Sequence, residues 1–128
     1  MEAETRNRPS FANIKVDLGA GDRIIAEAGA MASMSSSINV TTRWNGGCFG
    51  AFLRRIFGGE TLFVNEFTTA SQGELVLTQP MPGDIECIEL KGTTLFLQPG
   101  AFLACEPGVN LGLGWAGIAS FVGGEGLF

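Results

Sequence analysis

The chain has 128 residues, with 8 basic and 13 acidic side chains and a net charge of −5. A chain of this length forms one domain, and its acidic balance argues against binding to a nucleic-acid backbone, which depends on clustered Lys and Arg. Charged residues make up only 16% of the chain, and there are 19 Gly residues. This composition predicts either a surface partly covered by a partner or a second copy, or a compact β protein with many turns.

The N-terminal third of the chain predicts a polar leader followed by strands. Residues 1–10 are polar with one Pro, and we expect a disordered leader there. Apolar and polar residues then alternate, or β-branched residues cluster, which predicts half-buried strands over residues 14–18, 23–28 and 38–43. The intervening residues 29–37 are small apart from two Met, so this run is a place where backbones or subunits can approach closely.

Gly pairs bracket a Phe-rich segment that predicts the one short helix of the chain, near residues 48–57. Its apolar residues have the spacing of one helix face, and two Arg fall off that face: Phe49, Phe52, Leu53, Ile56 and Phe57, with Arg54 and Arg55. About two helical turns are not stable alone. The segment therefore plugs the end of its own sandwich, lies in a subunit interface, or lies on a membrane surface with the Arg pair at lipid phosphates. The net negative charge weakens the membrane alternative.

The rest of the chain predicts short strands separated by Gly- and Pro-containing turns. The expected strands are residues 62–69, 74–79, 84–90, 93–98 and 109–113. Turn signals at this spacing indicate about ten strands in a sandwich or barrel. Asp84, Glu86 and Glu89 are the densest acids, and two of them fall on one face of the predicted strand and the third on the other. We interpret them as a solvated strand edge.

Two parts of the chain repeat, which predicts duplicated supersecondary units. A Gly-Gly-Glu-x-Leu-Phe run over residues 58–63 returns over residues 123–128, and residues 22–30 align with residues 93–101. We predict a single β domain over residues 11–128, built from pseudo-repeat 1 (about 14–84) and an incomplete pseudo-repeat 2 (about 85–128). Because the chain stops where the second unit should enter its next strand, we expect it to be the N-terminal part of a longer protein.

The repeated motif carries a Glu after each Gly pair: Gly58, Gly59 and Glu60, then Gly123, Gly124 and Glu125. Each Glu either contacts a ligand or accepts hydrogen bonds from loop amides, with the glycines supplying positive φ angles. Glu60 has the further alternative of pairing with Arg54 or Arg55. Repetition favours the structural role, because a duplicated turn needs the same residue twice.

The chain contains no His and no Tyr, which removes the commonest general base and the usual metal ligand of jelly-roll enzymes. Cys48, Cys87 and Cys105 are too far apart in sequence for a CxxC redox or zinc motif. Their odd number, without a signal peptide, indicates a reducing compartment, and we expect them to pack as small apolar groups. We predict no catalytic residue, no cofactor and no metal.

From about Asn13 onward, the order of motifs resembles the family known from altered inheritance of mitochondria, or mitochondrial biogenesis. The motifs are Gly29-Ala-Met31 with Met34, Arg54-Arg55 with Gly59-Glu60, Pro82-Gly83-Asp84-Ile85, Gly100 to Ala104, and Gly123 to Phe128. The resemblance implies two tandem units like those of the tryptophan RNA-binding attenuation protein superfamily, a short double-stranded β-helix that forms oligomers. It supplies no reaction, and family members are usually longer.

Together these observations predict an all-β fold, a double-stranded β-helix or β-sandwich of tandem pseudo-repeats. We expect a non-enzymatic, self-associating scaffold or binding module in the cytoplasm, assembled as a trimer or larger ring, with no nucleic-acid partner. Nucleic-acid binding has only fold analogy in its favour, and fold does not fix function. The alternative is a peripheral membrane protein that docks on lipid through the Phe-rich 49–57 helix.

Overall fold

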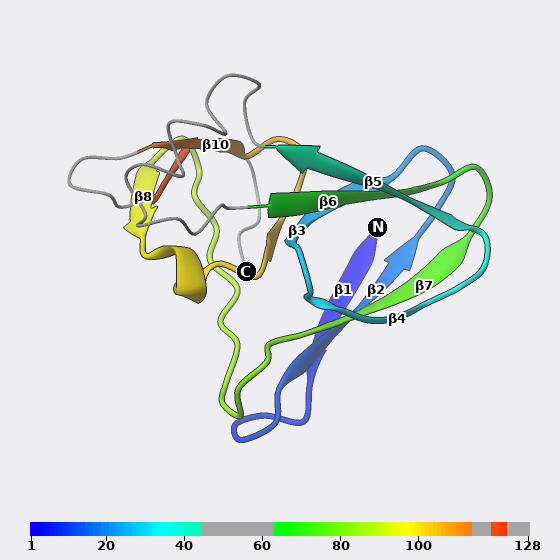
Figure 1. Ribbon diagram of the computed structural model, residues 1–128, viewed down its shortest axis with the longest axis horizontal. Helices are drawn as coiled ribbons and strands as arrows, with labels where there is room; N and C mark the ends of the chain where they lie inside the picture. The colour runs from blue at the N-terminus through cyan, green and yellow to red at the C-terminus, as the bar shows by residue number, and fades with distance from the viewer. Residues whose placement is uncertain (45–62, 114–118, 123–128) are drawn as a thin grey trace.

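In the computed structural model, the described residues are 1–44, 63–113 and 119–122 (Figure 1). The predicted helix near residues 48–57 and both Gly-Gly-Glu runs lie outside these ranges.

The described residues form an all-β structure, as the sequence predicts, with a single short 3₁₀ turn, η1 (Pro99–Ala101). Every strand pair in the sheets is antiparallel. The strands are β1 (Glu2–Arg6), β2 (Asn13–Leu18), β3 (Arg23–Glu27), β4 (Met31–Met34), β5 (Ile38–Trp44), β6 (Phe63–Thr69), β7 (Gly73–Thr78), β8 (Thr94–Leu97), β9 (Ala104–Cys105), β10 (Asn110–Leu113) and β11 (Ala119–Val122).

Seven predicted strands are confirmed, with bounds close to those expected: β2, β3, β5, β6, β7, β8 and β10. The strand predicted over residues 84–90 is wrong. This segment is irregular, with a single isolated bridge position at Ile88. The alternation of residue types there reflects the burial of Ile85 and Leu90 in the cores, without strand pairing.

The expectation of a disordered leader over residues 1–10 is wrong for the segment that forms β1. All five residues of β1 pair with β2, from Glu2 opposite Asp17 to Arg6 opposite Asn13. The segment looks like a leader in sequence because β1 is an edge strand, and edge strands carry charged residues that discourage unwanted pairing. Its order comes from the ladder with β2, which local composition does not reveal.

β4 is also absent from the sequence prediction, and the reason is a β-bulge. Met31 lies opposite Leu77 and Met34 opposite Leu75, with a register shift between Met31 and Ser33. The bulge places Met31 and Met34, three positions apart, on the same face of the sheet. The period of two that marks a strand is therefore lost.

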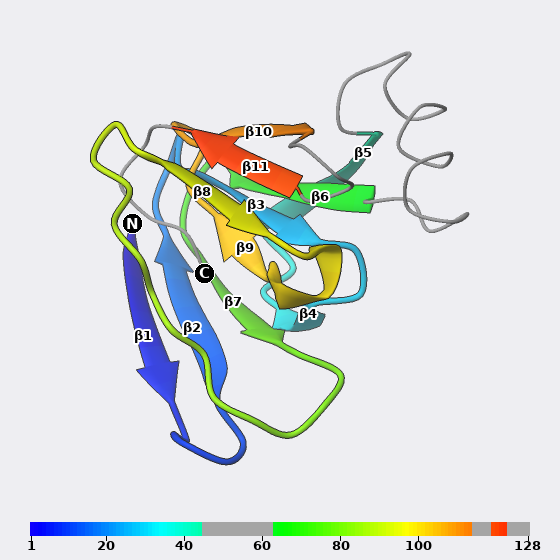
Figure 2. The same cartoon turned by 90° about the vertical axis from the view of Figure 1, so that its left-hand side faces the viewer.

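The strands form three stacked layers, which we call the outer sheet (β1-β2-β7-β4), the middle sheet (β5-β6-β3-β9) and the small sheet (β10-β11-β8). Figure 2 shows the small sheet on the far side of the middle sheet from the outer sheet. The small sheet has the same arrangement as part of the middle sheet: β11 lies between β10 and β8, as β6 lies between β5 and β3.

Two apolar cores separate the three layers, so the middle sheet is covered on both faces. The first core lies between the outer and middle sheets and includes Ile14, Val16, Ile24, Phe67 and Leu75. The second lies between the middle and small sheets and includes Val64, Leu90, Phe102, Cys105 and Val109. Alternation in β3 sends Ile24 and Ala26 into the first core and Ile25 against the second.

Candidate functional site

The site residues predicted from the sequence all lie outside the described residues. They are the Phe-rich segment (Phe49, Phe52, Leu53, Arg54, Arg55, Ile56 and Phe57) and the repeat motif (Gly58, Gly59, Glu60, Gly123, Gly124 and Glu125). Their proposed roles stay predictions, and Cys48 belongs to the same undescribed part of the chain.

Within the described residues, a polar cluster joins Arg8 to Asp84 and Glu86. Arg8 Nε and Nη2 donate to Asp84 Oδ1 and Oδ2 at 2.8 and 2.9 Å, and Nη2 also donates to Glu86 Oε2 at 2.8 Å. Hydrogen bonding by Arg8 lowers the pKa of Asp84 and, in return, raises the pKa of Arg8. Asp84 is therefore held ionised as an acceptor, which suits a structural contact better than acid–base chemistry.

This cluster links the loop after β1 to the segment after β7, at one end of the outer sheet. Ala12 N donates to Gly83 O at 3.0 Å, and Gly83 N donates to Ser10 O at 2.7 Å. Glu89, the third acid noted in the sequence, pairs separately with Lys91 at 3.3 Å. No pattern in the sequence predicts this contact, because Arg8 lies in the expected leader.

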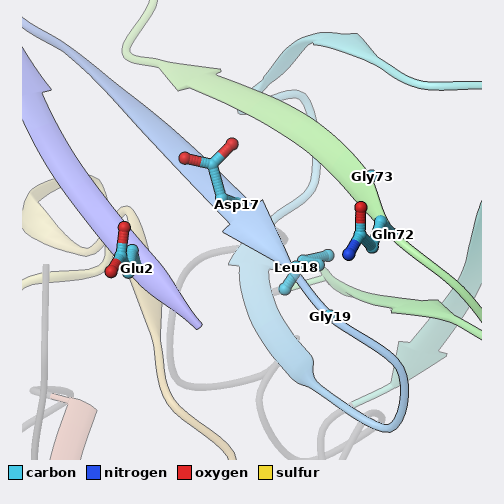
Figure 3. Close-up of a pocket in the computed structure, with 6 residues that line it drawn as sticks. All are labelled: Glu2, Asp17, Leu18, Gly19, Gln72 and Gly73. Atoms are coloured by element: carbon cyan, nitrogen blue, oxygen red, sulfur yellow. The ribbon is translucent and has the colours of Figure 1, made fainter.

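Figure 3 shows a shallow hollow at the end of the outer sheet where Glu2 and Asp17 present carboxylates from neighbouring strands. Glu2 lies opposite Asp17, and Asp17 opposite Glu74, so three acids form a row across β1, β2 and β7. Lys15 Nζ offsets this charge at 3.3 Å from Glu74 and 3.6 Å from Asp17. Hydrogen bonding to Glu74 is the largest cause of the raised pKa of Lys15.

Neither described cysteine is an activated nucleophile. Burial, reinforced by the charge of Glu106, raises the pKa of the Cys105 thiol to about 12. Cys87 is exposed, yet partial desolvation and nearby carboxylates raise its pKa as well. The thiolate is the reactive form, and both environments disfavour it. Nor do the described residues contain a group of three or more His, Cys, Asp and Glu that could hold a metal ion.

The outer and middle sheets each end in a strand that carries partly exposed apolar side chains. We call these strand segments, β4 and residues 38–42 of β5, the open edge. Met31, Met34 and Val40 are each 39% exposed there. Their strand partners Leu77, Leu75 and Phe67 are fully buried. Cross-strand partners share a face, so these three residues point inward but lack a cover.

The open edge is also free of charge, because residues 28–42 contain no Asp, Glu, Lys or Arg. The sequence marked part of it, residues 29–37, as a run that permits close approach of backbones or subunits. The exposure of the inward-facing side chains could not be found in this way, since it depends on where both sheets end. Among the described residues, no helix is long and apolar enough to cross a membrane.

Comparison with known proteins gives a family and a fold. The family model described as Mitochondrial biogenesis AIM24 matches residues 3–128. An uncharacterised protein of Streptococcus pyogenes serotype M6 is 29% identical over 126 residues, which cover 92% of this chain and 51% of that protein. The chain thus spans about half the length of this curated relative.

The crystal structure of another Streptococcus pyogenes protein superposes with a TM-score of 0.76 at 24% identity, covering 98% of this chain and 62% of that one. This likeness concerns the fold alone. The names of these relatives state no ligand and no reaction.

Proposed function

This chain belongs to the Mitochondrial biogenesis AIM24 family, and from that premise we propose that it is a non-enzymatic, self-associating scaffold or binding module. No reaction is attached to the relatives that it matches. The Asp84 carboxylate accepts two hydrogen bonds from Arg8. The described thiols have raised pKa values, and the whole chain has no His.

The open edge is the observation that carries the proposal. Residues 28–42 carry no charge, and the inward-facing Met31, Met34 and Val40 are each 39% exposed. The protein is therefore stabilised when another molecule covers these side chains. Burying apolar surface contributes about 25 cal/mol per Å². Exposed apolar surface beside unpaired strand edges is typical of interaction sites.

We further propose that the fold is a double-stranded β-helix of tandem units assembled as a trimer or larger ring. The shared strand order of β5-β6-β3 and β10-β11-β8 supports the tandem units. The low share of charged residues, 16%, supports assembly. We place the scaffold in the cytoplasm, on the expectation of a reducing compartment drawn from its cysteines.

The native mass in solution tests the proposal. Light scattering at two protein concentrations should give a defined multiple of the 13.5 kDa chain, with a trimer or a larger ring as the expected result. A monomer at both concentrations would remove the self-association hypothesis. A mass that rises without limit would indicate aggregation of an unprotected edge rather than a closed assembly.

The alternative is a peripheral membrane protein that docks through the Phe-rich 49–57 helix. Its support is the spacing of Phe49, Phe52 and Phe57 on one helix face with Arg54 and Arg55 beside it. Flotation with liposomes separates the two functions. Recovery of the protein with lipid, and its loss in a Phe52→Ser/Phe57→Ser variant that stays folded, would favour the membrane function. Loss of self-association in that variant would instead place the helix at a subunit interface.

A further inference from the structure

We propose that the open edge is the docking surface for a second copy of this chain, which adds a strand beside β4 and covers Met31, Met34 and Val40. The inference rests on the proposed self-association and names the surface that carries it. Three features of the described residues support it: the free strand edges, the direction of the side chains and the absence of charge.

The first feature is that each of the two sheets ends in a strand with a free side. β4 is the last strand of the outer sheet and β5 the last strand of the middle sheet. One side of each strand has no partner among the described strands, and unpaired strand edges recruit another strand. The opposite end of the outer sheet differs, because β1 carries the charged residues Glu2, Glu4 and Arg6. Charged edge strands resist pairing, so β4 is the end suited to a partner.

The second feature is the inward direction of the exposed side chains. The bulge in β4 keeps Met31 and Met34 over Leu77 and Leu75. Val40 in β5 lies opposite the buried Phe67. All three therefore border the first core from the side, where the sandwich between the two sheets is open. An added strand would extend the sheet and close the core in one step.

The strands of the open edge are held in place before any partner arrives. Ser37 Oγ donates to Gln72 O at 2.5 Å, and Thr69 Oγ1 donates to Ser37 O at 3.0 Å. Ser35 N donates to Glu74 O at 2.9 Å, while Glu74 N donates to Ser35 Oγ at 2.8 Å. These bonds fix the turn between β4 and β5, and a preorganised surface loses little entropy on docking.

The third feature, charge, favours a second copy over other occupants. A basic protein or an anionic membrane is recognised by complementary charge, and residues 28–42 offer none. A second copy has the same net charge of −5, so two copies repel each other least where both are neutral. The open edge is such a surface, and its apolar residues supply the attraction that charge does not.

The experiment compares two substitutions of the same kind at different places. Met34→Lys puts a charge on the open edge, whereas Met81→Lys puts it in the loop after β7, where Met81 is 71% exposed. Light scattering over a concentration series should show the assembly weakened by about tenfold or more for Met34→Lys and unchanged for Met81→Lys. Circular dichroism and thermal melting show whether each variant is folded.

A measurement on the unsubstituted chain keeps the test decisive even where Met34→Lys fails to fold. Hydrogen exchange of the amides of residues 31–34 should slow several-fold as the protein is concentrated from monomer to assembly, while β1 amides should not change. Protection that does not depend on concentration would overturn the proposal, because the cover would then come from the same chain or be absent. If the wild type assembles and a folded Met34→Lys variant assembles equally well, this inference is wrong but the proposed function stands. A wild-type monomer removes the proposed function with it.

Discussion

Arg8 and Asp84 lie 76 positions apart in sequence, yet two nitrogens of Arg8 meet the two carboxylate oxygens of Asp84 at 2.8 and 2.9 Å. Parallel paired bonds of this kind fix geometry as well as distance. They join the loop after β1 to the segment after β7, where Ala12 and Gly83 are also linked through their backbones at 3.0 Å. One end of the outer sheet is therefore closed by polar contacts, in contrast to the open edge.

The first prediction concerns the pH dependence of this joint. Asp84→Asn should lower the melting temperature at neutral pH, because it removes the charge that Arg8 binds. Hydrogen bonding by Arg8 lowers the pKa of Asp84 below its usual 3.8 in the folded protein. The carboxylate's contribution is therefore fully present above pH 3.8 and is lost as the pH falls through the lowered pKa. The melting temperatures of wild type and variant should converge in acid.

Glu89→Gln is the matched control, because Glu89 pairs only with the neighbouring Lys91 among the ion pairs given by the structure, and both side chains are mostly exposed. Its melting temperature should follow that of the wild type at every pH. A difference between wild type and Asp84→Asn that persists in strong acid would mean that the carboxylate charge is not the cause of the stabilisation.

The second prediction tests the close approach of β7 to the start of β5. A Cβ atom at Gly73 would lie 2.6 Å from Cγ1 and 2.9 Å from Cδ1 of Ile38, and Ile38 is buried. Gly73→Ala should therefore lower the free energy of unfolding by about 1–3 kcal/mol, as overpacking does. Urea unfolding measures the change.

Two further variants give this test its specificity. Gly100→Ala should have little effect, because nothing lies within 4 Å of the added atom. In an Ile38→Ala background, Gly73→Ala should cost less than it does alone, since the clashing atoms are gone. Equal costs of Gly73→Ala in both backgrounds would refute the clash as the cause.

The third prediction uses two Phe residues that the structure places in opposite environments. Phe67 is fully buried in the first core, whereas Phe96 is 53% exposed. Phe67→Ala should lower the free energy of unfolding by about 3–5 kcal/mol, through lost burial and the cavity left behind. That is a large share of the roughly 5–15 kcal/mol that stabilises a typical domain. Phe96→Ala should cost much less, and similar losses at both positions would contradict the assigned core.

The fourth prediction concerns thiol reactivity in a Cys48→Ser background, which leaves the two described cysteines. Iodoacetamide at mildly alkaline pH should modify the exposed Cys87 and leave Cys105 unmodified until denaturant is added. Burial raises the pKa of Cys105 to about 12, so almost no thiolate forms there in the folded protein. Mass spectrometry of tryptic peptides follows both sites, and a Cys87→Ser variant isolates the second. Equal labelling rates in the native state would contradict the buried placement.

Local patterns were enough to predict most of the strands. Ile14, Val16 and Leu18 alternate with polar residues, and all three are buried as expected. The sequence prediction missed β1, β4, β9 and β11, and the first two show how a strand can depend on its neighbour. β1 has the composition of a leader and is held by its ladder with β2, while a bulge against β7 removes the alternation from β4.

The candidate surfaces were harder to predict from the sequence than the strands. Residues 29–37 were marked as a small-residue run, but nothing in that run indicates that Met31 and Met34 face the same way. The sequence predicts that Asp84 and Glu86 face away from Glu89, but it does so for a strand that the structure does not contain. In the structure, Asp84 and Glu86 contact Arg8, and Glu89 pairs with Lys91. Arg8 lies on a distant loop, and no local pattern links the two segments.

The sequence by itself determined the all-β class, most strand positions and the absence of His, because these follow from residue types and short-range alternation. The tertiary structure decided that the sheets stack in three layers, that β3 has apolar residues on both faces for two different cores, and that β4 and β5 are end strands of their sheets. These properties depend on which distant strands meet, and long-range packing selects among the many pairings that the same local patterns allow.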